Sequence, residues 1–285
     1  MVKIAAQTYS LFRECSEDLE GTLRTLRQIG FQSVEPPLQP FLSPGIQSDE
    51  SGRLWSPETL AAAGGYLREL GMNISSVHVG INFGMYALPI ELIRTNILAL
   101  HDTYGITDFV ASGAFSTVEK VEHWAKLAQD VSDAIRPYGC RLLYHNHDDE
   151  FRLIRDNGIE KEAIEAFLNK TSDDVLLQVD IGWAAMTTDL LAFLRKHKDR
   201  VGSLHLKDFY SGYQCYSRAE MPTEIFAPIG EGVIPTNEVL SMLDSFQNFG
   251  GTVIIDQDKS GDGLRDMEIG YQNIRRMLSE GEKNG

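Results

Sequence analysis

The stretch YHNHDDEF, residues 144–151, places two histidines, an asparagine and three acidic side chains directly after an apolar run. In a β-strand, successive side chains point to opposite faces, so His145 and His147 share one face while Tyr144 and Asn146 take the other. Imidazole and carboxylate groups bind divalent cations and are also common groups for proton transfer. The stretch therefore indicates a metal site, an acid–base site or both.

Similar polar side chains follow other β-rich runs along the chain. They are Tyr9, Glu35, His78, Asp180 with Trp183, His205 with Lys207, and Asp256 with Asp258. A single histidine after a strand is most often structural, but the same arrangement on several strands favours one shared site. Imidazoles and carboxylates from four strands, namely His145, Asp180, His205 and Asp256, would make a mixed nitrogen and oxygen site for one divalent cation.

The identity of that cation stays open at this level. The donor set suits Mn²⁺, Co²⁺ or Zn²⁺, and it suits Mg²⁺ less well because two donors are imidazoles. The same four side chains could instead form hydrogen-bonded pairs that close the site without a metal ion.

The elements that must position these groups are read from hydrophobic periodicity. Short β-rich runs alternate with segments in which apolar residues recur every three or four positions, and most of these segments end near a glycine. Strands are expected at residues 3–10, 33–37, 73–80, 108–112, 141–147, 175–183, 201–209 and 251–258. Helices are expected at residues 17–30, 56–71, 91–105, 118–139, 161–170, 188–197, 236–247 and 266–280.

Eight strand–helix units predict a single domain over residues 1–285 with the (β/α)8 TIM barrel fold, whose sites lie at the carboxyl ends of the strands. An open doubly wound sheet is the alternative, but no GxGxxG turn follows the first strand. The least regular segment, residues 210–235, follows the seventh strand and is expected to fold over the site.

Composition excludes several function classes. Acidic residues number 41 against 26 basic ones, and the formal charge of −15 disfavours nucleic acid as a partner. No stretch of about 18 apolar residues and no leader pattern occurs, so we expect a cytoplasmic protein that does not enter membranes. The three cysteines are widely separated, which fits neither a disulfide framework nor a paired-cysteine zinc site.

The segments YHNHDDEF, QVDIGWA, LHLKD, PIGEGVIP and IIDQD, in this order and spacing, resemble the sugar phosphate isomerase/epimerase family. These proteins are also described as xylose isomerase-like TIM barrels or AP endonuclease family 2, and the resemblance spans essentially the whole chain. It implies a (β/α)8 barrel that holds one divalent cation through His145, Asp180, His205 and Asp256. Sugar epimerases of this kind usually carry paired glutamates at the positions of His145 and Asp256, and often a histidine where this chain has Trp183.

The resemblance and the chemistry together suggest roles for further residues. A hydroxyketone that chelates the cation would form an enediolate when a C–H proton leaves. Asp256 or Glu150 is expected to take that proton, and His147 to return it or to bind a hydroxyl. Lys207 is expected to stabilise an oxyanion or to pair with a neighbouring aspartate.

Substrate contacts are assigned to Glu35, His78, Tyr144, Trp183 and Asp258. Trp183 offers an apolar face for sugar C–H bonds, although packing at the rim would explain it equally well. Glu35 has a similar alternative as a loop cap. Because Lys207 is the sole basic residue at the expected strand ends, an unphosphorylated sugar is favoured.

The function predicted from these residues is a metal-dependent isomerase or epimerase of ketosugars or related polyols. An elimination that cleaves a keto-sugar or keto-glycoside needs just one base and a metal, so a lyase or hydrolase is the main alternative. A non-catalytic sugar-binding barrel is a third, and the charge disfavours a DNA-repair endonuclease. A homo-oligomer stays open, since the outer helices of such barrels often pair.

Overall fold

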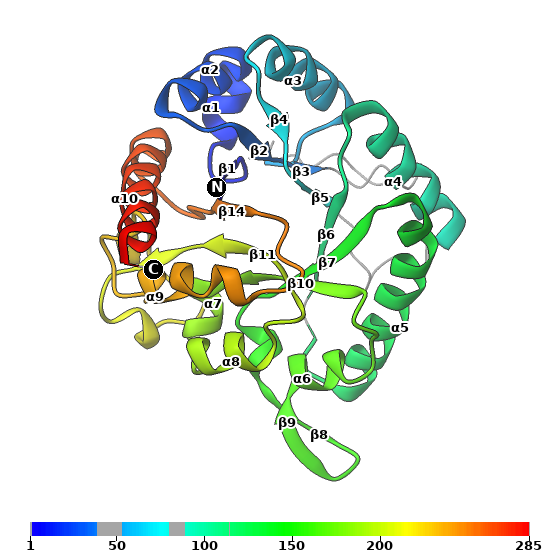
Figure 1. Cartoon of the computed structure of the whole chain (residues 1–285). Coiled ribbons are helices and arrows are strands. Elements are labelled where there is room, and N and C mark those ends of the chain that lie inside the picture. Colours follow the sequence, from blue (N-terminus) through cyan, green and yellow to red (C-terminus); the bar gives the residue numbers. More distant parts are fainter. Residues whose placement is uncertain (1, 39–52, 80–88, 114, 285) are drawn as a thin grey trace.

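In the computed structural model, which describes residues 2–38, 53–79, 89–113 and 115–284, ten short parallel strands form one curled sheet (Figure 1). The sheet order is β3-β5-β6-β7-β10-β11-β14-β1-β2-β4. These strands are β1 (Lys3–Gln7), β2 (Ser33–Glu35), β3 (Pro37–Leu38), β4 (Asn73–Ile74), β5 (Val77–Val79), β6 (Asp108–Ser112), β7 (Arg141–His145), β10 (Val175–Asp180), β11 (Val201–Leu206) and β14 (Thr252–Ile255).

The sheet closes on itself through pairing between two strands that are each interrupted once. Pro36 separates β2 from β3, and two serines separate β4 from β5, so each pair is one barrel strand in two pieces. β2 pairs with β4 and β3 pairs with β5, while β1 lies between β14 and β2. Eight barrel strands result within the described ranges, and the predicted (β/α)8 barrel is confirmed.

Helices surround the barrel on the outside (Figure 1). The α-helices are α1 (Phe12–Glu17), α2 (Leu19–Ile29), α3 (Pro57–Glu69), α4 (Ile90–Tyr104), α5 (Val118–Ile135), α6 (Ala163–Leu168), α7 (Ile181–Ala185), α8 (Leu190–Lys196), α9 (Thr236–Ser241) and α10 (Gly263–Asn284). Short 3-10 helices are η1 (Arg136–Tyr138), η2 (Asp149–Phe151), η3 (Tyr213–Cys215), η4 (Thr223–Ile225) and η5 (Leu243–Ser245). Within the described ranges, each helix is too short or too polar to cross a bilayer.

Local signals explain where several helices begin. Ser56, Thr117 and Asp189 each precede a helix, and each side chain accepts a hydrogen bond from a backbone N–H in the first turn. Such caps satisfy N–H groups that have no partner inside the helix. At the other end of α4, Gly105 takes the left-handed conformation, with φ of 70°, that lets the chain turn back into β6.

Two apolar layers fill the interior. The larger one lies between the strands and the helices and contains most of the buried aromatic side chains. The smaller one lies inside the barrel and consists of Val110, Leu143 and Leu176. This separation follows from strand alternation, since every second side chain points inward.

Several expected bounds were wrong: the first, fifth, seventh and eighth barrel strands end earlier than expected, at Gln7, His145, Leu206 and Ile255. Residues 161 and 162 belong to a strand, not to a helix, because β8 (Leu153–Asp156) and β9 (Ile159–Glu162) form an antiparallel hairpin that projects from the barrel (Figure 1). Its turn is Asn157-Gly158, with φ of 51° and 80°, as such two-residue turns require. The sixth barrel strand also ends at Asp180 and not at residue 183, because Asp180 caps helix α7.

The contact between α6 and α8 yields a stability prediction. Glu165 accepts hydrogen bonds from Lys196 at 2.6 Å and from His197 at 2.7 Å. Partial burial favours its neutral form, but the hydrogen bonds from His197 and Lys196 outweigh this and lower the pKa of Glu165 to about 2. A depressed carboxylate pKa stabilises the fold above the unfolded-state pKa of about 4.3, and this contribution is lost as pH falls toward the folded-state pKa.

We therefore expect Glu165→Gln to reduce the free energy of unfolding by about 1 kcal/mol near neutral pH, allowing for solvent screening, and by much less near about pH 3. Urea unfolding at both pH values measures this difference. Glu224→Gln, at an exposed position, is the matched control. A destabilisation by Glu165→Gln that is equally large in acid would contradict the assignment.

Candidate active site

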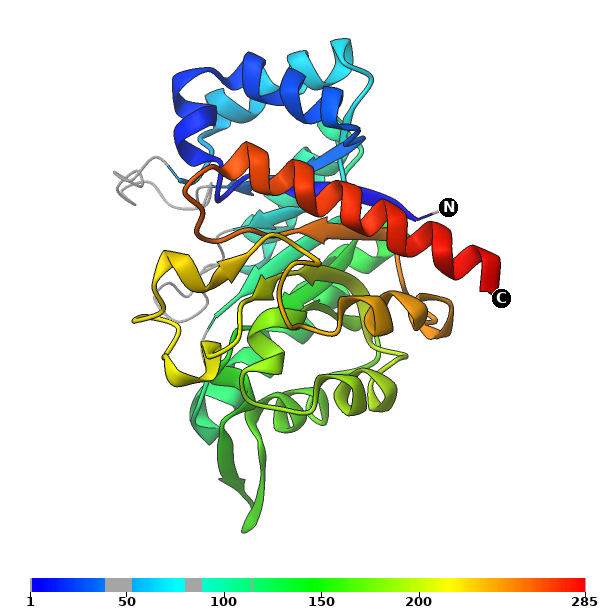
Figure 2. The same ribbon diagram turned by 90° about the vertical axis from the view of Figure 1, so that its left-hand side faces the viewer.

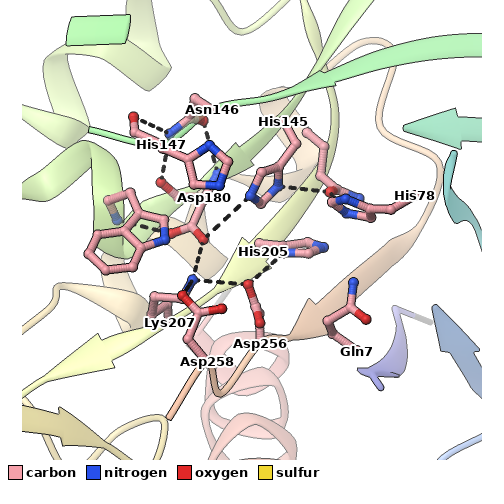
Figure 3. A network of polar contacts seen from close by, with 12 residues as sticks. Gln7, His78, His145, Asn146, His147, Asp180, His205, Lys207, Asp256 and Asp258 are labelled. Carbon is pink, nitrogen blue, oxygen red and sulfur yellow. Dashed lines mark hydrogen bonds and ion pairs between the residues drawn. The ribbon is translucent and has the colours of Figure 1, made fainter. Parts of the chain in front are cut away.

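A cavity of about 610 Å³ opens among the carboxyl ends of the barrel strands. Its polar wall is formed mainly by side chains that end strands or follow them, namely Gln7, His78, His145, His147, His205, Asp256 and Asp258. Trp183 and Phe226 form an aromatic part of the wall. Figure 3 shows these polar side chains converging from different strands. The site thus lies where the fold prediction placed it.

His205 is held between two carboxylates. Its Nε2 lies 2.6 Å from Glu35 Oε1, and its Nδ1 lies 3.0 Å from Asp256 Oδ2. Burial disfavours the charged ring, but Glu35 and Asp256 outweigh burial and raise the pKa of His205 to about 10. Because both ring nitrogens face acceptors, the imidazole is doubly protonated in this arrangement.

Lys207 lies beside it and is almost completely buried. Its ammonium contacts Asp180 at 2.8 Å, Asp256 at 3.0 Å and Asp258 at 2.6 Å. Burial favours the neutral amine, but the three carboxylates outweigh it and raise the pKa of Lys207. Since an ammonium has three protons, each is used in one of these contacts. The ammonium also lies 4.7 Å from the centre of a ring of Trp183.

The glycine of the segment DIGW is required by this packing. A Cβ atom on Gly182 would come within 2.8 Å of the Lys207 side chain and within 3.1 Å of Phe209. Glycine therefore lets α7 approach β11 closely enough for Asp180 to reach Lys207. Asp180 also caps this helix by accepting the backbone N–H of Trp183 at 2.9 Å.

Glu35 is fully buried behind His78 and His205. It accepts hydrogen bonds from Gln7 at 2.9 Å, from Gln178 at 2.7 Å and from Ser76. Burial alone would favour the neutral acid, but the charges of His205 and His78 outweigh it and lower the pKa of Glu35 well below its usual range. The structure therefore places Glu35 as the partner of the two histidines, beneath the cavity wall.

His145 has a different environment from His205. Its Nδ1 lies 3.0 Å from Gln178 Oε1, and its Nε2 lies 3.9 Å from Asp180 Oδ2. Burial, together with the charge of His205, lowers the pKa of His145 well below its usual range. A neutral imidazole is the form that binds metal ions.

The four residues predicted as ligands are brought together. One donor atom from each of His145, Asp180, His205 and Asp256 lies within 4.8 Å of the others. Asp256 Oδ1 is buried and has no hydrogen-bond partner among the described residues. The carboxylates of Asp180 and Asp256 and the neutral imidazole of His145 fit a divalent cation, although His205 would have to release a proton and Lys207 would compete for the carboxylates. The metal-free alternative is the network of ion pairs that His205 and Lys207 make with the surrounding carboxylates.

Tyr144 and Glu150 lie outside the cavity. Tyr144 points outward and packs among Phe115, Trp124 and Phe167, and its hydroxyl donates to Glu150 Oε1 at 2.6 Å. This is the opposite face to His145, as strand alternation requires. The structure therefore does not bring Tyr144 to a substrate in the cavity.

Glu150 instead contacts the backbone of the cavity wall, where its Oε2 accepts the N–H of His147 at 2.9 Å. Burial raises the pKa of Glu150 to about 7 against the opposing effect of hydrogen bonds from Tyr144 and His147. His147 lines the cavity, and its Nδ1 is buried without a partner among the described residues. Burial and the charges of Arg218 and Lys207 lower the pKa of His147 to about 3, so the ring is neutral at neutral pH.

Asp258 and Trp183 stand at the edge of the cavity. Burial and the charge of Asp256 raise the pKa of Asp258 to about 6, against the opposing charge of Lys207. The indole of Trp183 packs against Phe209 and Phe226, with ring centroids 5.3 Å and 6.1 Å apart. Trp183 therefore both packs at the rim and presents a surface to the cavity.

Sequence reasoning missed Gln178, which lies at the centre of the network. Its Nε2 donates to Glu35, and its Oε1 lies 3.0 Å from both His78 and His145. The signal was available, because Gln178 precedes Asp180 by two positions on one strand and so shares its face.

The irregular segment after the seventh strand reaches the cavity through Arg218 and Phe226. Arg218 contacts Asp148 at 2.8 Å and Asp149 at 3.0 Å. The short strand β12 (Asp208–Phe209), just before this segment, pairs with β13 (Phe226–Ala227) inside it. Asp208 fixes its end by accepting backbone N–H groups from three residues, Gly230, Gly232 and Ile234.

Basic side chains also reach the wall from outside the strand ends. Arg53, Arg218 and Lys259 line the cavity. The expected strand ends carry few basic residues, but the cavity as a whole does not lack them.

Comparison with known proteins places this geometry in a family. One similar structure, a sugar phosphate isomerase/epimerase from Parabacteroides distasonis, is 18% identical, with a TM-score of 0.74 over 98% of this chain and 95% of that chain. A D-tagatose 3-epimerase-like protein is 15% identical, with a TM-score of 0.69 over 99% of both chains. A probable 3-DHS dehydratase from Bacillus anthracis is 10% identical, with a TM-score of 0.69 over 96% of this chain and 98% of that chain.

These identities show a shared fold. No curated protein sequence matches the chain significantly. The family model described as xylose isomerase-like TIM barrel matches residues 23–277, in agreement with the family expected from the motifs. The chain therefore belongs to the xylose isomerase-like TIM barrel family.

Proposed function

We propose that this protein is a sugar isomerase or epimerase that depends on one divalent metal ion and acts on a ketosugar or related polyol. The observation that carries the proposal is the convergence of His145, Asp180, His205 and Asp256, of which all but the fully buried Asp180 line one cavity. The names of similar structures, which include sugar isomerases and epimerases, support the substrate class. The ion is proposed to be Mn²⁺, Co²⁺, Zn²⁺ or Mg²⁺.

Such an ion, when bound, would draw negative charge from the carbonyl and hydroxyl oxygens of a hydroxyketone and so make a neighbouring C–H bond more acidic. The protein must then supply a base. Asp256 is suited to this role because its Oδ1 has no partner among the described residues, while its Oδ2 is fixed by His205 and Lys207. The charges of Lys207 and His205 outweigh burial and lower the pKa of Asp256, so this carboxylate is ionised.

His147 is proposed to bind a substrate hydroxyl or to return the proton. Its neutral ring lines the cavity and has one unsatisfied nitrogen, which can donate or accept according to its tautomer. Glu150 is proposed to act through His147, because it holds the backbone of that residue and does not reach the cavity. It is thus a positioning residue and not the base.

Lys207 is also proposed as a positioning residue. With all three protons engaged by Asp180, Asp256 and Asp258, it has none left for a substrate oxyanion. Its charge holds the three carboxylates together at the cavity wall. Trp183 and Phe226 would then face the C–H bonds of the sugar, as aromatic rings do in many carbohydrate sites.

An elimination is the second candidate, and one observation favours it. Epimerisation by two opposed carboxylates needs a second acid across the substrate, but the corresponding strand end carries the neutral imidazole of His145. A lyase or hydrolase that expels a group from a keto-sugar or keto-glycoside needs only one base such as Asp256. Both reactions share the first proton transfer.

The experiment that tests the proposal detects this first proton transfer. Protein freed of metal by chelation and then supplied with each ion is incubated with ketosugars and 3-keto-glycosides in D₂O, and the products are identified by NMR. Deuterium next to the carbonyl in an isomer or epimer supports the first candidate, and release of the β-substituent supports the second. Binding of sugars without exchange under any ion would instead identify a non-catalytic sugar-binding barrel.

The metal ligands give a separate prediction. Asp180→Ala and His205→Ala should each abolish stoichiometric metal binding, and with it proton exchange, because each removes a donor from the cluster. Elemental analysis by mass spectrometry checks the bound metal, and circular dichroism checks the fold. His101→Ala, a histidine on α4, should retain the metal. Full metal content in both cavity variants would contradict the ligand assignment.

The raised pKa of Glu150 predicts how stability varies with pH. The unfolded carboxyl ionises near about pH 4.3, whereas in the fold it ionises near about pH 7. Protonated Glu150 is therefore favoured by folding, and this contribution is lost as pH rises between those values, by about 3 kcal/mol. Glu150→Gln should remove that loss. The free energy of unfolding of the variant, relative to that of the parent protein, should therefore increase from about pH 5 to about pH 8, which is roughly the range set by the two pKa values.

Urea unfolding across this range measures the effect. Glu160→Gln on the projecting hairpin, an exposed position, is the control and should leave the pH dependence unchanged. Parallel pH profiles of the parent and Glu150→Gln would show that Glu150 ionises normally in the fold.

A further inference from the structure

A second cavity, of about 380 Å³, lies at the amino ends of the barrel strands. This is the opposite end of the barrel from the candidate active site, as the N-terminus and the yellow segment on opposite sides of Figure 2 show. Hydroxyl groups dominate its polar wall, from Ser33, Ser75, Ser76, Thr107, Ser203 and Thr252. The proposed reaction uses none of the hydroxyls from this wall as an acid or base.

Two of these hydroxyls lack partners. Ser33 and Ser203 are 1% and 4% exposed, and neither Oγ has a hydrogen-bond partner among the described residues. Leaving a buried hydroxyl unpaired costs about 1–3 kcal/mol, so folded proteins rarely do so. Both residues line the cavity, so a ligand bound there would be a neighbouring source of the missing hydrogen-bond partner.

The shape of the barrel interior explains the space. Val110, Leu143 and Leu176 fill one side of the interior with bulky side chains. On the other side, the inward positions of β1, β2 and β11 carry the small residues Ala5, Ser33 and Ser203. The gap left by these small side chains is bounded by hydroxyls.

The charged side chains at the rim are either paired with each other or exposed to water. Arg141 Nε lies 2.7 Å from Asp108 Oδ1, and Arg141 Nη1 donates to the backbone oxygen of Asn248 at 2.7 Å. These two side chains satisfy each other, and Lys3 is exposed at the rim, where water solvates its charge. Ile74 and Ile254 add an apolar part to the wall.

Serine and threonine hydroxyls both donate and accept hydrogen bonds. A wall of such groups beside apolar surface complements a ligand with several hydroxyls on a carbon skeleton, and the volume falls within the range of small-molecule sites. We propose that the amino-terminal cavity binds a small neutral polyhydroxy compound, a polyol or sugar, at a site separate from the candidate active site.

An occupant would lie close to the network at the other mouth. Ser76 lines the amino-terminal cavity and donates a hydrogen bond to Glu35, and Ser75 Oγ lies 3.4 Å from Ser76 Oγ. The ligand would therefore be separated from Glu35 by one serine side chain.

Xylitol is the probe for the test, and backbone amide signals of the protein in NMR spectra report where it binds. Gly202 and Gly250 line the amino-terminal cavity, whereas Gly113 lines the other one. We expect xylitol to shift the Gly202 and Gly250 signals. Ser203→Val, which fills the space, and Ser33→Ala, which only deletes a hydroxyl, should each weaken this binding about tenfold. Ser112→Val at the opposite cavity should leave it unchanged.

Four results would overturn the proposal. One is a shift of the Gly113 signal alone on addition of xylitol, and another is an affinity at Gly202 and Gly250 that is the same in both variants as in the parent protein. A crystal structure grown with xylitol that shows ordered water only in this cavity would also overturn it, as would tighter binding of inorganic phosphate there. The readout needs neither metal nor turnover, so it does not depend on the proposed function.

Discussion

The buried ammonium of Lys207 is the constraint on which the candidate site depends. Moving an ion out of water costs several kcal/mol unless close opposite charges replace the lost hydration. The replacement here comes from Asp180 at the end of β10 and from Asp256 and Asp258, which follow β14. Because these acids belong to different parts of the barrel, satisfying one cation fixes the relative positions of neighbouring strand ends.

The second buried cation, His205, links further strand ends on the other side of the barrel in the same way. It joins Asp256 to Glu35, which lies on β2, and Gln178 joins Glu35 to His145. Carboxylates outnumber cations in this network, so one carboxylate oxygen, on Asp256, is left without a partner among the described residues. An excess of buried negative charge favours the binding of a further cation, so the residues that form this metal-free network could also hold the metal ion proposed above.

The fold and much of the candidate site could be predicted because both follow from the hydrophobic periodicity of the sequence. Strand–helix alternation gave the barrel, and the fold in turn brought His145, Asp180 and His205 to one mouth. The position of Glu150 could not be predicted, since it depends on a short 3-10 helix that turns this side chain back toward Tyr144. Gln178 was passed over for a different reason, namely that an amide neither titrates nor commonly binds metal, although strand alternation places it beside Asp180.

The two mouths of the barrel differ because residue size and charge are distributed unevenly along its axis. At the carboxyl ends, long ionisable side chains meet and neutralise each other, which leaves an open cavity above them. Toward the amino ends, bulky residues such as Leu143 fill only one side, and small residues such as Ser33 lie on another. Substituting larger apolar residues would close that space and remove an unpaired hydroxyl, so packing alone does not account for serine there. The hydroxyl lining is better explained by a polar occupant, with Ser76 as the shared wall between it and Glu35.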